Sequence, residues 1–102
     1  MSVVDVEVAV GGSALVIKQA DGRHCSLSAA LLWSECPSAQ GRVRRARGQR
    51  TAPSDIAIAD VREVGTYGVN IVFSDGHDRG IYPWSYLATL AERPQLEDFL
   101  TA

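Results

Sequence analysis

The chain has 102 residues, of which 46% are hydrophobic and 22% charged, and its formal net charge is −2. This length and composition are typical of one globular domain and exclude a disordered or fibrous chain. No apolar run reaches the roughly 18 residues of a membrane span, and residues 1–10 lack the basic and apolar regions of a secretory signal. We therefore expect a cytoplasmic protein in which the two cysteines, Cys25 and Cys36, are free thiols.

The first third of the chain predicts three short strands and a helix. Residues 3–10 alternate between apolar and polar side chains, which is typical of a half-buried strand. The apolar face of this strand consists of four valines: Val4, Val6, Val8 and Val10. Residues 14–18 and 23–27 predict a hairpin around an Asp-Gly turn. Residues 29–35 then predict a helix, because the hydroxyl of Ser28 can accept a backbone N–H at its first turn.

Residues 38–53 show no apolar periodicity, so we expect a flexible, polar loop there. Five of its arginines fall within nine positions: Arg42, Arg44, Arg45, Arg47 and Arg50. The rest of the chain holds the other five basic residues against all twelve acidic ones, a net charge of −7. A concentrated positive field of this kind attracts an acidic protein or a nucleic acid. The acidic remainder of the chain and the lack of interleaved aromatic residues favour a solvated loop or an acidic protein partner over a nucleic acid.

The second half of the chain predicts two strands, a hairpin and a helix. Residues 56–64 predict a strand with a bulge near Asp60, and residues 67–74 predict the next strand. Pro83 suits the first position of a helix, in which apolar residues recur with helical spacing at Trp84, Leu87 and Leu90. A last amphipathic turn is predicted from three further residues: Leu96, Phe99 and Leu100.

Together these elements predict one α+β domain over residues 1–102. It should contain a mainly antiparallel sheet of five to six strands with two or three short helices, because short turns rather than helices connect most of the strands.

The stretch SDGHDRGIYPW, residues 74–84, predicts a tight hairpin with a two-residue turn at Asp75 and Gly76. The carboxylate of Asp75 can accept a backbone N–H two residues on, and Gly76 supplies a positive φ. Gly80 would leave room for a bulky neighbour. These three residues are therefore interpreted as structural.

The register of this hairpin separates a core face from an outer face, because cross-strand partners share a face. The core face carries four side chains: Val69, Ile71, Phe73 and Tyr82. The outer face presents His77 and Arg79. Histidine is a frequent metal ligand and proton carrier, so the turn leaves His77 as a candidate functional residue. Asp75 and Asp78 lie close to it, but no nucleophile motif accompanies them, and we expect no catalysis.

The strings VGTYGVNIVFSDGHDRGIYPWSYL and LLWSECPSAQ resemble the DUF971 family, also called the γ-butyrobetaine-hydroxylase-like N-terminal domain, over residues 4–91. In the hydroxylases that carry it, the resemblance implies a zinc ion held by three cysteines and a histidine. The corresponding positions are Cys36, Ser38, Gly41 and His77. Structural zinc needs four N or S ligands, and only Cys36 and His77 can serve, so we expect no cofactor. Trp33 also stands where the family usually has arginine.

The resemblance implies a non-catalytic protein-interaction or accessory module. Relatives are fused to oxygenases and to Mrp-type ATPases of iron–sulfur cluster assembly, which suggests a partner of one of these kinds by analogy. The expected contact surface combines His77 and Arg79 with the five arginines of residues 42–50, braced from beneath by Tyr82 and Trp84.

Two alternatives stay open. One is a metal- or cluster-binding protein that uses Cys36 and His77, with ligands shared across a dimer. The other is nucleic-acid binding through the five arginines.

Overall fold

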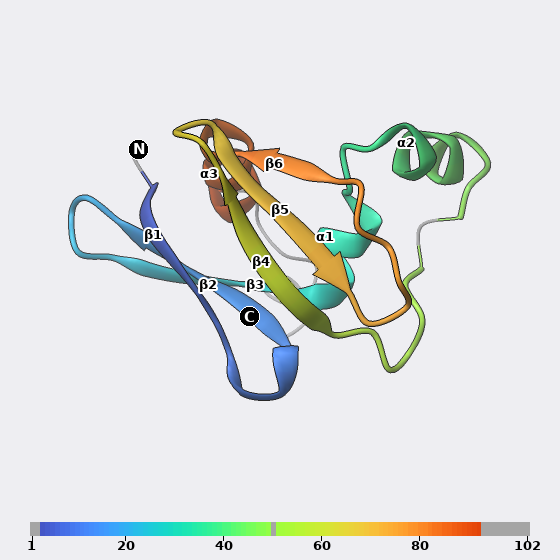
Figure 1. Ribbon diagram of the computed structural model, residues 1–102, viewed down its shortest axis with the longest axis horizontal. Coiled ribbons are helices and arrows are strands. Elements are labelled where there is room, and N and C mark those ends of the chain that lie inside the picture. Colours follow the sequence, from blue (N-terminus) through green and yellow to red (C-terminus); the bar gives the residue numbers. More distant parts are fainter. Residues whose placement is uncertain (1–2, 50, 93–102) are drawn as a thin grey trace.

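The computed structural model describes residues 3–49 and 51–92 (Figure 1), and the predicted turn at residues 96–100 lies outside them. The described residues form an α+β fold with two three-stranded antiparallel sheets, ordered β1-β2-β3 and β4-β5-β6. The strands are β1 (Val3–Val8), β2 (Ala14–Gln19), β3 (His24–Ser28), β4 (Ile58–Val64), β5 (Gly68–Phe73) and β6 (Ile81–Pro83). The helices are α1 (Ala29–Ser34), α2 (Ala39–Ala46), α3 (Trp84–Glu92) and a short 3₁₀ turn, η1 (Val10–Gly12). In Figure 1, the turn between β2 and β3 lies at one end of the long axis and α2 at the other.

The core lies where both sheets meet α1 and α3. Every second residue of β2 and of the second half of β5 is buried, as the period of two for strand side chains requires. The largest fully buried side chains come from all of these elements: Leu15, Ile17, Leu27, Leu32, Ile71, Phe73, Tyr82, Leu87 and Leu90. Each such burial contributes about 1.5–3 kcal/mol to the hydrophobic stabilisation. None of the helices in the described residues is long and apolar enough to cross a membrane.

The predicted first strand is shorter and less regular than its sequence pattern indicates. It ends at Val8, and its register with β2 shifts between Val3 and Asp5. Beyond the shift the pairing is regular up to Val8, the last residue of the strand, which is 38% exposed, while Val10, beyond it in η1, is 98% exposed. Val6 packs against the core and Val8 lies on the same face of the strand, as predicted, whereas the prediction is wrong for Val10, which lies beyond the strand; the side chain of Val4 lies outside the described part.

The predicted cap of the first helix is confirmed. The hydroxyl of Ser28 accepts the backbone N–H of Leu31 at 3.1 Å, and α1 begins at the next residue, Ala29.

The β5–β6 hairpin has a three-residue loop instead of the predicted two-residue turn. The N–H of Phe73 donates to the carbonyl of His77 at 2.8 Å, and the N–H of Gly76 donates back to the carbonyl of Phe73 at 3.0 Å. Gly76 is the third loop residue, with φ of +91°, and a left-handed glycine at that position is typical of three-residue hairpins. The prediction placed the Asp-Gly pair one position too early in the turn.

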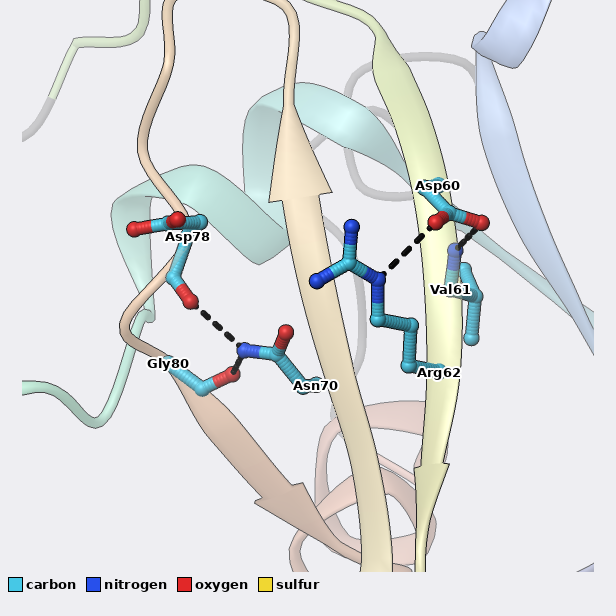
Figure 2. A network of polar contacts seen from close by, with 6 residues as sticks. All are labelled: Asp60, Val61, Arg62, Asn70, Asp78 and Gly80. Carbon is cyan, nitrogen blue, oxygen red and sulfur yellow. Dashed lines mark hydrogen bonds and ion pairs between the residues drawn. The ribbon is translucent and has the colours of Figure 1, made fainter.

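The register recovers beyond the loop, and Val69 pairs with Tyr82 as predicted. The amide of Asn70 bridges the irregular stretch by donating to the carbonyls of Asp78 at 2.7 Å and Gly80 at 2.9 Å (Figure 2). Because the register recovers, Phe73 and Tyr82 are both buried, as the sequence predicted.

Gly80 provides a test of how tightly the hairpin packs against the rest of the fold. A Cβ at this position would lie 2.5 Å from Cys36 Sγ and 3.1 Å from Tyr82 Cε1, and both side chains are fully buried. We expect Gly80→Ala to lower the free energy of unfolding by about 1–3 kcal/mol, as overpacking does. Chemical denaturation of Gly80→Ala, Cys36→Ala and the double variant measures this. The glycine substitution should be less destabilising once the sulfur is removed, and an equal loss in both backgrounds would contradict the contact.

Candidate functional site

The predicted Arg-rich loop contains helix α2, which corrects the prediction of a flexible segment over residues 38–53. Ser38 begins the helix, because its hydroxyl accepts the N–H of Gly41 at 3.1 Å. Gly48, with φ of +76°, follows its last turn. Apolar periodicity did not predict this helix, because its buried residue is Gly41 and not a large apolar residue.

Two of the five arginines fasten α2 to the end of α1. Arg45 Nη1 donates to the carbonyls of Ser34 at 3.0 Å and Cys36 at 2.7 Å, and Arg44 Nη2 donates to the carbonyl of Trp33 at 3.4 Å. Carbonyls at the end of a helix lack donors within it, and a cation there is favoured by the helix dipole. Arg44 and Arg45 thus have a structural role, whereas Arg42 and Arg47 are exposed.

Arg44 also completes a cluster with Trp33, Asp75 and His77, which we call the Trp33 cluster. Its guanidinium carbon lies 3.5 Å from the centroid of the Trp33 ring, a cation–π contact. Trp33 Nε1 donates to Asp75 Oδ2 at 2.8 Å, and the N–H of His77 donates to Asp75 Oδ1 at 3.0 Å. His77 Nε2 lies 3.4 Å from Arg44 Nη2, and its ring centroid is 6.3 Å from that of Trp33.

The cluster corrects the prediction that His77 turns outward from the hairpin. The side chain is half-buried against Trp33 and Arg44, which the sequence places 44 and 33 positions away. The prediction for Asp75 is confirmed, because its carboxylate accepts the backbone N–H two residues on. Sequence reasoning noted Trp33 only as a departure from the family pattern and missed its contact with Arg44.

The electrostatics of the cluster favour an ionised Asp75 and a neutral His77. Burial alone would raise the pKa of Asp75, but hydrogen bonds from the His77 N–H and from Trp33, together with the charges of His77 and Arg44, lower it below its usual value. Burial, and then the charge of Arg44, lower the pKa of His77 against the opposing influence of Asp75 and Asp78. A neutral imidazole protonated on Nδ1 can accept from Arg44, which only donates.

Three of the positions that correspond to the zinc ligands, Cys36, Ser38 and Gly41, lie together, but their side chains do not fit the metal. Cys36 is fully buried and its thiol donates to the hydroxyl of Ser38 at 3.2 Å. A Cβ on Gly41 would lie 2.3 Å from the carbonyl oxygen of Cys36, so this position has no space for a side chain. His77 faces a guanidinium, which repels a cation. The described residues contain no group of three or more His, Cys, Asp or Glu that is arranged to hold a metal ion.

The remaining predicted residues lie at different distances from the cluster. Tyr82 is buried and its hydroxyl donates to the carbonyl of Leu32, the residue before Trp33 in α1. Burial raises the pKa of Tyr82 far above its usual value. Trp84 does not support the cluster, because its Nε1 donates at 3.0 Å to the carbonyl of Thr66, in the turn between β4 and β5. Arg79 is exposed, and Arg50 lies outside the described residues.

The pKa of His77 should depend on Arg44 and not on Arg42. We expect His77 to titrate below its ordinary value of 6.5 and Arg44→Ala to raise its pKa, whereas the exposed control Arg42→Ala should leave it unchanged. NMR titration of the imidazole signals measures this. Because the unfolded chain binds the proton more readily, the free energy of unfolding should fall as the pH decreases through about 6.5. Identical titration midpoints in all three proteins would contradict the proximity of the two groups.

Comparison with known proteins places the chain in a family. The model of the family "Gamma-butyrobetaine hydroxylase-like, N-terminal" matches residues 6–88. A crystal structure of a DUF971-family protein of unknown function from Acidithiobacillus ferrooxidans ATCC 23270 is similar, with a TM-score of 0.73 and 29% identity over 90% of this chain and 94% of that one. Two proteins solved by NMR in solution cover 98% of this chain and 77% of theirs, with TM-scores of 0.70 and 0.67 and identities of 29% and 24%; the latter shows the fold alone. No curated protein matches. The chain therefore belongs to the γ-butyrobetaine-hydroxylase-like N-terminal, or DUF971, family.

Proposed function

We propose that this domain is a non-catalytic accessory module of the cytoplasm that binds an acidic segment of a partner protein. The observation that carries the proposal is the attachment of α2 to α1 by Arg44 and Arg45. It holds the remaining arginines of the helix in fixed positions. A rigid array of cations loses less conformational entropy on binding than a flexible loop does.

Helix geometry determines which arginines face a partner. Successive residues are about 100° apart around the helix axis. Arg42 therefore lies about 60° from Arg45, and Arg47 about 60° from Arg44, on the sides that α1 leaves uncovered. Both are exposed, as is Arg79 in the hairpin segment that follows His77. Guanidinium groups bind carboxylates with two parallel hydrogen bonds, so an acidic segment suits this surface.

The groups with acid–base capacity in the cluster are already engaged, which supports a binding role over a catalytic one. Both oxygens of Asp75 accept hydrogen bonds, and His77 Nε2 faces Arg44. The net charge of −7 on the rest of the chain favours a short acidic segment over a nucleic acid, whose extended negative charge it would repel. By analogy with the family, the favoured partner class is an oxygenase or an ATPase of iron–sulfur cluster assembly.

A pull-down from native lysate with mass spectrometry tests the proposal. The wild-type protein should retain one stoichiometric partner protein after nuclease treatment, and rising salt should weaken this retention. The triple variant Arg42→Ala/Arg47→Ala/Arg79→Ala should lose the partner. The matched control is Arg23→Ala, which removes a side chain that is 76% exposed in an ion pair with Asp21, at the turn between β2 and β3.

Equal capture of the partner by the wild-type protein and the triple variant would contradict the proposed surface. Salt-sensitive retention on DNA or RNA that disappears in the triple variant would instead support the nucleic-acid alternative. Stoichiometric zinc or iron in the purified protein, lost in Cys36→Ala, would support the metal-binding alternative.

A further inference from the structure

A groove of about 330 Å³ lies between β1 and β4, the outer strands of the two sheets. Residues 5–8 line one side of it, and residues 59–61 and 63 line the other. Side chains of a strand alternate between its two faces, so a groove lined by successive residues runs along the edge of the strand. The two strands lie near each other, because residues of both line this groove, although they belong to different sheets.

The backbone of β1 presents free groups to this groove. The N–H of Ala9 donates to the carbonyl of Ala14 at 2.9 Å, which makes these two residues a hydrogen-bonded pair. Such pairs alternate along an antiparallel ladder with pairs whose N–H and C=O groups point away from the partner strand. Val8, opposite Leu15, and Val6, opposite Ile17, are pairs of the second kind. Their N–H and C=O groups therefore point away from β2, towards the groove.

The backbone of β4 also directs N–H and C=O groups towards the groove, from the opposite side. The N–H of Ile71 donates to the carbonyl of Gly80, so it points away from β4. Val61 is opposite Ile71, and Glu63 is opposite Val69, two residues along the same strand. The N–H and C=O groups of Val61 and Glu63 consequently point away from β5. Among the residues that the structure describes, two strand edges without a partner strand thus face one another across the groove.

Each edge is covered by an aspartate of its own strand. Asp5 Oδ1 accepts the N–H of Val6 at 2.9 Å, and Asp60 Oδ1 accepts the N–H of Val61 at 2.9 Å (Figure 2). Charged side chains along an edge strand discourage its pairing with other strands. The same pattern therefore occurs on both sides of the groove, although the two strands are distant in sequence.

The groove is strongly acidic. Its lining includes Asp5, Glu7, Asp60 and Glu63 and no lysine or arginine. Glu7 pairs with Lys18 at 3.3 Å and Asp60 with Arg62 at 3.0 Å, from positions outside the lining. Within the described part of the chain, Asp5 and Glu63 form no ion pair.

We infer that the groove binds an extended segment of a partner protein in which lysine or arginine alternates with apolar residues. The segment would lie as an added strand between β1 and β4. Its cations would draw the carboxylates of Asp5 and Asp60 away from the backbone, and its carbonyl groups would accept the N–H groups of Val6 and Val61 in their place. A neutral or acidic segment supplies no cation for this exchange, so the charge of the groove selects a basic one.

NMR titration of the ¹⁵N-labelled protein with two short synthetic peptides tests this inference. One peptide alternates lysine and valine, and the control peptide of equal length alternates glutamate and valine. The lysine peptide should produce saturable shifts of the edge amides of Val6, Val8, Val61 and Glu63, whereas the glutamate peptide should not. Asp5→Asn/Asp60→Asn should weaken the binding of the lysine peptide at least about tenfold, an effect of the size expected from two lost charge contacts. The exposed control Asp55→Asn should not weaken it.

Several outcomes would overturn the inference. They are shifts confined to other surfaces, equal binding of the glutamate peptide, no binding of either peptide, and edge-amide shifts that appear with protein concentration alone, which would indicate a second copy of the chain. The triple arginine variant should bind the lysine peptide as the wild-type protein does. If the arginines prove not to bind an acidic partner, the result of the peptide titration is therefore unaffected.

Discussion

The closeness of three chain segments at Cys36 is the constraint on which the rest of the Trp33 cluster depends. Gly41 in α2 and Gly80 in the hairpin approach so near that an added Cβ would lie 2.3 Å from the carbonyl oxygen of Cys36 or 2.5 Å from its sulfur. With both side chains reduced to hydrogen, α1, α2 and the β5–β6 hairpin meet without a gap. Arg44 is three residues after Gly41 and His77 three before Gly80, so the same contact brings these two side chains together.

Within the cluster, burial, hydrogen bonds and the charge of Arg44 together decide which groups carry charge. Asp75 stays ionised because donors and cations outweigh the penalty of its burial, while burial and Arg44 keep the proton off His77. The guanidinium of Arg44 contacts the face of the Trp33 ring and donates to the carbonyl of Trp33, and these contacts replace part of its hydration. The positive field available to a partner therefore comes from the exposed arginines beside the cluster, and the cluster itself acts as their support.

The sequence predicted the features that depend on local chemistry. The α+β class, the cap at Ser28 and the burial of Phe73 and Tyr82 follow from residue type and spacing. The family follows from the resemblance of two longer strings to its members. The features it did not predict depend on distant contacts or on one inserted residue. Helix α2 has no apolar stripe, because its contacts with the end of α1 are made by Gly41 and by the side chains of Arg44 and Arg45. Glycine and arginine in such a segment are typical of a solvated loop, which is what the sequence pattern predicted. Strand β1 ends at Val8, so Val10, which the alternation placed on the apolar face of the strand, lies in η1 and is exposed.

The Trp33 cluster was hidden for the same reason. Trp33 bonds to Asp75, which is 42 positions away, and no local pattern signals the pair. The basic helix α2 lies at one end of the long axis, on the other side of the molecule from the acidic strand β1 (Figure 1).

An open strand edge usually carries a risk of unwanted pairing, and here two such edges face each other. An aspartate that covers the amide of the next residue reduces that risk, because a neutral strand would have to displace a carboxylate and leave it unpaired in the groove. A basic strand meets no such obstacle, since it pairs with the displaced carboxylate as it takes the amide. Protection against general association and selection of one class of partner therefore follow from the same two hydrogen bonds.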